Sequence, residues 1–118
     1  MPYIDGFVIP VPIANKEAYR EEAARFWPIF RDHGALEVWE CWGEDLPAGE
    51  VTSFPMAVKL EPGEAVVFSW VLWPDRETRL AAHDGMMNDP RMKEGTQPFD
   101  GKRLIYGSFD PLFTAGSH

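Results

Sequence analysis

The feature that most constrains this chain is a set of β-strand candidates that are apolar on both faces. In the segment 65–73 (AVVFSWVLW), bulky side chains such as Trp70 would point to one face, while valines such as Val71 point to the other. The segments 3–11 (YIDGFVIPV) and 103–109 (RLIYGSF) show the same two-sided pattern. A sheet with one solvated face normally alternates apolar and polar residues. Both faces of this sheet therefore need a cover.

Two helices alternate with these strands along the chain. Strands are predicted at 3–11, 35–43, 65–73 and 103–109, and helices at 16–33 and 76–88. Asn15 and Asp75 stand where helix N-caps are expected. The order β-α-β-β-α-β is the split pattern of ferredoxin-like α+β folds. We therefore predict one domain over 1–118, with an antiparallel βαββαβ sheet and both helices on one face.

Two helices can cover only one face of a four-stranded sheet. The simplest cover for the other face is the sheet of an identical subunit, which would make a homodimer, the dimeric α+β barrel. The alternative is a monomer in which the insert 44–62 and the C-terminal tail fold over that face. We expect the homodimer.

Composition narrows the class of partner. The chain has 11 Lys plus Arg against 19 Asp plus Glu, a net charge of -8, so nucleic-acid binding is not expected. An apolar window of ~20 residues is lacking, so we expect no membrane partner. One cysteine, Cys41, and no leader pattern suggest a cytoplasmic protein. The sequence shows no metal-ligand spacing, phosphate loop or dinucleotide fingerprint, so neither a metal nor another cofactor is expected.

Several distinctive blocks resemble the YbaA-like family of small bacterial proteins of unknown function. They are YIDGFVIPVP, ECWGEDLPAGEVTSF, GEAVVFSWVLWPDRETR, MMNDPRMK and PFDGKRLIYGSFDPL. The likeness extends over nearly the whole chain. It implies a ferredoxin-like α+β fold of the dimeric-barrel type, in agreement with the strand patterns, and it implies no particular reaction.

Two glycines guide the placement of a candidate site. Gly6 and Gly107 lie on strands that neighbour each other in this fold, and a missing side chain lets a helix approach closely. If both glycines face the helices, Asp5 and Tyr106 face the barrel interior. The second strand has no such marker, and we assign Glu40 to the interior as well. Two carboxylates in apolar surroundings would have raised pKa values and could transfer protons; the alternative is a purely structural role.

Six residues are the candidate ligand contacts. They are Asp5, Glu40, Trp42, Trp70, His83 and Tyr106. His83 is included because it follows Leu80 by three residues on the predicted inner face of its helix. The loop 93–102, with its glycines and proline, is either a lid over the site or an ordinary connection.

Three functions are compatible with these features. The first is a homodimer that binds a small molecule, with aromatic compounds among the options. The second is a non-catalytic structural or regulatory dimer with a solid interior. The third, by analogy of fold alone, is a cofactor-free monooxygenase-like enzyme. The sequence does not decide whether the protein is an enzyme.

Overall fold

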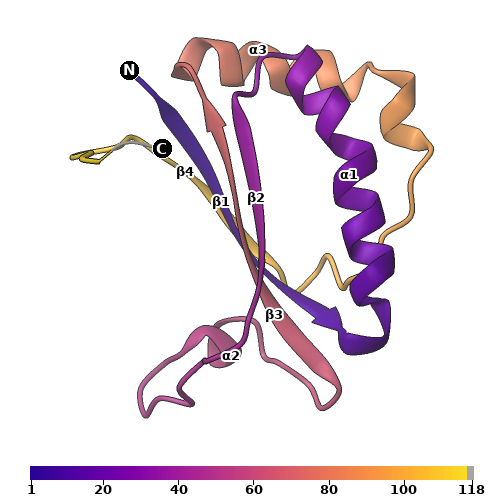
Figure 1. Ribbon diagram of the computed structural model, residues 1–118, viewed down its shortest axis with the longest axis vertical. Helices are drawn as coiled ribbons and strands as arrows, with labels where there is room; N and C mark the ends of the chain where they lie inside the picture. The colour runs from indigo at the N-terminus through magenta and orange to yellow at the C-terminus, as the bar shows by residue number, and fades with distance from the viewer. Residues whose placement is uncertain (117–118) are drawn as a thin grey trace.

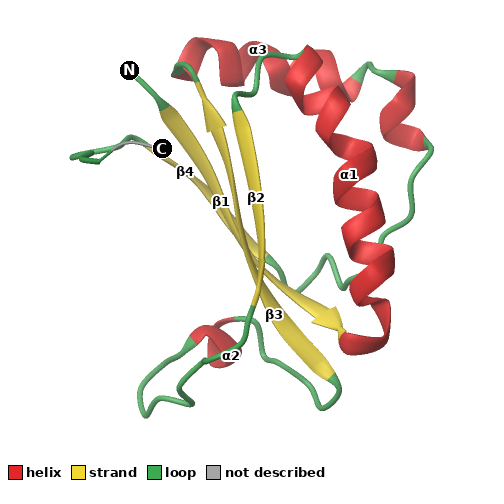
Figure 2. Cartoon of the chain, viewed as in Figure 1, coloured by secondary structure: helices red, strands yellow, loops and turns green. Residues whose placement is uncertain are grey.

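The computed structural model describes residues 1–116 and shows an antiparallel sheet with helices on one face (Figure 1). The elements are β1 (Tyr3–Pro12), η1 (Ile13–Asn15), α1 (Lys16–Asp32), β2 (Glu37–Trp42), α2 (Phe54–Ala57), β3 (Glu64–Trp73), α3 (Arg76–Met87), η2 (Pro90–Lys93) and β4 (Ile105–Phe109). The strand order is β2-β3-β1-β4, and α1 and α3 lie on the same side of the sheet (Figure 2). The predicted ferredoxin-like α+β architecture is confirmed. The terminal His118 lies outside the described residues.

Short-range capping signals place most helix starts where the sequence predicts them. The side chain of Asp75 accepts a hydrogen bond from the backbone N–H of Thr78 at 2.7 Å and caps α3. Ser53 caps the short α2 in the same way. Asn15 precedes α1 as predicted, but its side chain makes no cap; instead it donates to the carbonyl of Pro98 at 3.2 Å. Asn15 thus ties the start of α1 to a distant loop.

Strand register decides which residues face the helices. Gly6 on β1 lies directly opposite Trp70 on β3 and Gly107 on β4, so these three residues share one face. That face points away from α1 and α3, because the neighbouring residues on β1 form the core beneath the helices. The prediction that the two glycines face the helices is therefore wrong. A Cβ on either glycine would meet the ring of Phe109 at 3.4–3.5 Å, an ordinary van der Waals contact, so the ring packs beside both glycines on this face.

The core lies between the sheet and the two helices. Toward one end, Ile9, Val11 and Val67 pack against Tyr19 of α1. Toward the other end, the strand residues Val71 and Trp73 pack against Ala35 and against Ala82 of α3. Burial of such side chains is the main driving force for folding.

Asp5 joins four elements through one buried carboxylate. It accepts hydrogen bonds from the indole N–H of Trp73 on β3 at 3.0 Å and from Ser108 on β4 at 2.6 Å. It also pairs with the Arg79 guanidinium of α3, at 3.0 Å. A buried charge needs such compensation. Asp5 thus links α3 to the middle of the sheet.

The face of the sheet away from α1 and α3, called the open face below, is apolar. Trp39 on β2 stacks on Trp70 with ring centroids 5.5 Å apart, and Phe68 on β3 meets Phe54 of α2 at 5.9 Å. The insert therefore contacts this face as the monomeric alternative requires, but it leaves most of the face open. Exposed fractions remain 48% for Trp39, 45% for Phe68, 46% for Ile105 and 59% for Phe109.

Removal of the Asp5 carboxylate should strongly destabilise the fold. Asp5→Ala leaves the Arg79 guanidinium and the Trp73 indole without their acceptor, and breaking a buried pair in this way costs about 3–5 kcal/mol. The free energy of unfolding from urea titration measures the effect. Glu17→Ala, which removes an exposed partner of Arg20, is the control and should change stability by less than about 1 kcal/mol. Equal effects of the two substitutions would contradict the role assigned to Asp5.

Candidate functional site

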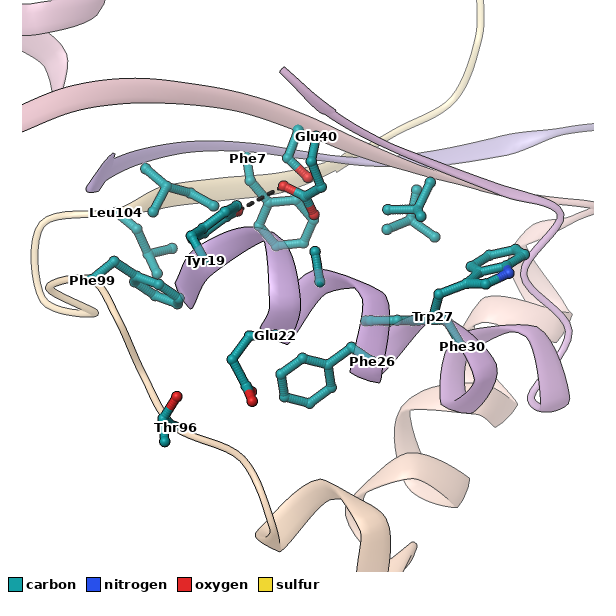
Figure 3. Close-up of a pocket in the computed structure, with 15 residues that line it drawn as sticks. Phe7, Tyr19, Glu22, Phe26, Trp27, Phe30, Glu40, Thr96, Phe99 and Leu104 are labelled. Carbon is teal, nitrogen blue, oxygen red and sulfur yellow. Dashed lines mark hydrogen bonds between the residues drawn. The ribbon is translucent and has the colours of Figure 1, made fainter. Parts of the chain in front are cut away.

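A cavity of about 190 Å³ lies between α1 and the helix-facing side of the sheet (Figure 3). Its walls are almost entirely apolar, and aromatic rings from three parts of the chain contribute to them. The labelled residues in Figure 3 are Phe7, Tyr19, Glu22, Phe26, Trp27, Phe30, Glu40, Thr96, Phe99 and Leu104. These side chains come from β1, α1, β2 and the segment before β4.

Helix α1 supplies one wall because its apolar residues recur at helical spacing. Tyr19, Ala23, Phe26, Trp27 and Phe30 lie three or four positions apart and so share one face of the helix. The same spacing predicts α1 from the sequence. Because large rings alternate with the small Ala23, this face leaves space in its middle instead of packing flush against the sheet.

The polar centre of the cavity is a hydrogen bond between Tyr19 of α1 and Glu40 of β2. The tyrosine hydroxyl donates to Oε1 of Glu40 at 2.6 Å, as the dashed line in Figure 3 shows. Burial raises the pKa of the Glu40 carboxyl, while hydrogen bonds from Tyr19 and Ser69 act in the opposite direction. Burial, together with the charge of Glu40 and this hydrogen bond, raises the pKa of the Tyr19 hydroxyl far above its usual range. Glu40 is nevertheless exposed overall, so the pair lies at the boundary between the cavity and solvent.

The other carboxylate at the cavity, Glu22, is neutralised. Arg25 donates to it from Nε at 3.1 Å and also reaches the carbonyl of Arg91 at 2.8 Å. No lysine or arginine forms an ion pair with Glu40 within residues 1–116. Glu40 is thus the carboxylate that a bound molecule would meet without a competing cation.

The segment before β4 closes one end of the cavity. Phe99 contacts the ring of Tyr19 edge-on, with centroids 5.9 Å apart, and Leu104 lies beside it (Figure 3). The segment is tied down at Pro98 by Asn15 and at Arg103 by Glu64, whose carboxylate lies 2.6 Å from the guanidinium. The loop 93–102 therefore overlies the site, as the lid interpretation requires, and it is anchored as well.

The six sequence candidates do not form one cluster. Glu40 lines the cavity, and Trp42 lies nearby on the same strand under the ammonium group of Lys16, 5.1 Å from the ring centroid. Asp5 and Tyr106 lie on the helix-facing side of the sheet with Glu40, and not in a barrel interior. The predicted placement of all three is wrong, because the two faces of β1, β2 and β4 were exchanged in the prediction.

The remaining candidates lie elsewhere. Tyr106 is 73% exposed on the edge strand β4, and Trp70 belongs to the open face, as predicted. His83 is exposed, so the prediction that it lies on the inner face of its helix is wrong. The inner face of α3 centres on Ala82, which is 2% exposed. The ligand-binding role of all six residues remains a prediction.

Sequence reasoning missed the partner of Glu40. Tyr19 was recognised only as part of the apolar face of a helix, and Phe99 only as part of a loop. A hydrogen bond across 21 positions leaves no local signal in the sequence. A tyrosine on the buried face of a helix nevertheless needs a partner for its hydroxyl, and this requirement was the available hint.

The described part of the chain holds neither a cluster of metal ligands nor a membrane-spanning helix. Residues 1–116 contain no group of three or more His, Cys, Asp or Glu side chains arranged to hold a metal ion. None of the helices there has the length and apolarity that crossing a bilayer requires.

Fold and connectivity define the class of protein. The chain has a ferredoxin-like α+β fold. It is similar to a solved structure of an MhuD mutant with two manganese protoporphyrin IX bound per active site, at a TM-score of 0.62 and 14% identity over 98% of this chain and 99% of that one. Rv0793 from Mycobacterium tuberculosis is similar at a TM-score of 0.50 and 16% identity over 98% of this chain and 100% of that chain. At such identities the likeness concerns the fold alone.

The family is defined by sequence. The profile of a family described as "Protein of unknown function (DUF1428)" matches residues 2–101. Uncharacterized protein YbaA of Escherichia coli (strain K12) is 55% identical over 114 residues, which cover 95% of this chain and 97% of the relative. The same identity holds for YbaA of Shigella flexneri. The chain belongs to this family, as the resemblance in its sequence blocks indicated.

The raised pKa of Tyr19 predicts a loss of stability in alkali. In the unfolded chain a tyrosine releases its proton above a pH of about 10, whereas the folded protein keeps Tyr19 protonated, so the fold loses stability as pH rises past that value. The free energy of unfolding should therefore fall more steeply with pH in the native protein than in Tyr19→Phe. Urea titrations between neutral pH and the onset of alkaline unfolding measure both slopes. Parallel slopes would show that Tyr19 is not held in its protonated form.

Proposed function

We propose that this protein binds a small, predominantly apolar molecule in the cavity between α1 and the sheet, and that it does so as a homodimer. One observation carries the binding part of the proposal. A space of about 190 Å³, lined by aromatic rings, contains a hydrogen-bonded carboxylate and tyrosine. Ligand sites in proteins combine an apolar lining with a few polar groups that fix orientation.

The existence of this space argues against a purely structural interior. Protein cores are packed as densely as organic crystals and leave few voids larger than a water molecule. Here Phe7, Phe26 and Phe30 surround a space that they do not fill. The cavity is smaller than the range of about 300 to 1,000 Å³ that is typical of sites for drug-sized ligands. A molecule built on one aromatic ring matches this size.

A porphyrin, which the MhuD structure contains, does not suit this cavity. Its four linked rings need far more room than about 190 Å³. Haem iron is usually held by His, Cys, Met or Tyr. Of these, only Tyr19 belongs to the lining within residues 1–116, and its hydroxyl is held by Glu40. We therefore base the proposal on a smaller ligand.

Filling the cavity should abolish binding. Ala23 points into the space, whereas Ala24, the next residue, is on the exposed side of α1. Titration of the native protein with a set of single-ring compounds, followed by backbone amide NMR shifts, should give saturable changes around Tyr19 and Glu40. Ala23→Phe should lose these changes, and the matched control Ala24→Phe should keep them. Binding at this site would be contradicted if no compound binds the native protein, or if the compounds bind Ala23→Phe as well as they bind Ala24→Phe.

The homodimer part of the proposal rests on the open face. Half-exposed aromatic and aliphatic side chains run across all four strands there, over a groove of about 520 Å³. Soluble monomers rarely expose apolar patches larger than a few hundred Å². The open face of a second copy would offer the same apolar surface around a two-fold axis. The fold class is consistent with this arrangement.

A charge on the open face should separate the subunits. Ile105 on β4 and Leu80 on α3 are equally exposed, at 46%, but only Ile105 belongs to the open face. Native mass spectrometry and sedimentation should show a dimer for the native protein and for Leu80→Glu, and a monomer for Ile105→Glu. A native monomer at micromolar concentration would refute the dimer.

These two experiments also separate the alternatives left by the sequence. A dimer that takes no ligand corresponds to the non-catalytic structural or regulatory protein. A cofactor-free monooxygenase-like activity would require both a bound ligand and proton transfer at that ligand, for which the Tyr19–Glu40 pair is positioned. Turnover of a bound compound under air, lost in Glu40→Gln, would support that third function.

A further inference from the structure

The Tyr19–Glu40 pair separates two spaces. A second cavity, of about 130 Å³, lies on the outer side of the pair and shares Tyr19, Ala23 and Glu40 with the inner one. The two volumes together reach the lower end of the range for ligand sites, about 300 Å³. The carboxylate of Glu40 therefore lies at the junction of an inner aromatic space and an outer one.

The outer space differs in character from the inner one. Lys16, Glu17 and Arg20 contribute to its walls. Their charges are engaged elsewhere: Arg20 pairs with Glu17 at 2.9 Å, and Lys16 lies over the ring of Trp42. A ligand in both spaces would place its apolar body inside and its polar end toward this charged rim.

Glu40 retains hydrogen-bonding capacity. A carboxylate offers about four lone-pair sites. Two of those on Glu40 accept from the hydroxyls of Tyr19 and Ser69, and the others remain for a ligand. No cation pairs with it in the described part of the chain, as shown above. Because carboxylate oxygens accept hydrogen bonds, Glu40 favours ligands that donate them. It disfavours ligands that are anionic.

We propose that the ligand carries a hydrogen-bond donor, a phenolic O–H or an ammonium N–H, at one end of a single-ring apolar body, and that Glu40 accepts from it. This inference rests on the proposed function and specifies the chemical class of the ligand. The ring occupies the inner cavity among Phe26, Trp27 and Phe30. The donor lies at the junction, beside the Tyr19 hydroxyl. The apolar lining of the inner cavity offers the ring no competing hydrogen-bond partner, so the donor is directed to Glu40.

A matched set of compounds tests the ligand class. Ethylbenzene, 4-ethylphenol, phenethylamine and phenylacetate have bodies of similar size and differ at the polar end. Dissociation constants come from amide NMR titrations of the full chain. We expect 4-ethylphenol or phenethylamine to bind about tenfold or more tightly than ethylbenzene, the usual gain from a hydrogen bond to a charged group. We expect phenylacetate to bind most weakly. The better of the two donors identifies the ligand as a phenol or an amine.

Two substitutions at the pair should act in opposite directions. Glu40→Gln removes the charge but keeps an oxygen that accepts from Tyr19, so the fold is retained and the advantage of the donor compounds falls about tenfold. Tyr19→Phe frees one lone pair of Glu40, so donor binding is kept or tightened. A merely structural role of the pair would weaken binding in both variants alike. Glu21→Gln, on the exposed side of α1, is the control and should match the native protein.

The outcomes separate this inference from the proposed function. If none of the four compounds shifts residues around the cavity, both the binding function and the ligand class are refuted. If ethylbenzene binds as tightly as the two donors, or Glu40→Gln leaves the ranking unchanged, the cavity binds ligands but the donor class is refuted. Tighter binding of phenylacetate than of ethylbenzene would likewise overturn the role of Glu40.

Discussion

The pairing of β1 with β3 and β4 is the constraint on which the rest of the structure depends. It places Gly6, Trp70 and Gly107 in one row and so commits every alternate residue of three strands to a face. A shift of one residue would exchange the two faces completely. Through β3 the same register fixes β2, so that Glu40 points toward α1 and its neighbour Cys41 toward the open face. One pattern of backbone hydrogen bonds therefore decides which side chains line the cavity and which lie on the open face.

The elements of the fold were predictable because their signals are local. Strand-forming runs, helical spacing and the cap at Asp75 gave the order and approximate bounds of the main elements. The phase of the strands was not predictable in this way. In a strand that is apolar on both sides, alternation cannot distinguish the helix-covered face from the open one. The two glycines were interpreted as room for a helix, whereas they lie on the open face beside the ring of Phe109.

The candidate site was predictable in part. Glu40 stands out in the sequence as a carboxylate between two tryptophans, and the structure places it at the cavity. Its partner Tyr19 depends on how far α1 lies from β2, which no pattern within either segment encodes. His83 was misplaced because the fully buried residue of α3 is its neighbour Ala82, a small residue that gives a weak periodic signal. Asp5 was recognised as a buried carboxylate, but its partner Arg79 was not.

The proposed homodimer and the proposed ligand site would use opposite sides of the sheet. The cavity lies on the helix-covered side of the sheet and the proposed interface on the open face, so a homodimer built through the open face would carry two cavities. The sheet itself is the shared wall: the side chains of Glu40 and Ser69 contribute to the cavity, while those of Cys41 and Phe68 in the same strands belong to the open face. A ligand need not alter the interface, and loss of the interface need not alter the cavity. Ligand binding and homodimer formation can therefore be tested independently of each other.

Cys41 provides the most direct test of this account, because it is the chain's one cysteine and lies on the open face next to Glu40. The measurement is the rate at which a small thiol reagent modifies it, in the native protein and in Ile105→Glu. That substitution lies on β4, at the opposite edge of the sheet from Cys41. The account predicts slow modification in the native dimer, fast modification in the variant, and no change in either when a compound occupies the cavity. Equal rates in the two proteins, or protection of Cys41 by a cavity ligand, would contradict it.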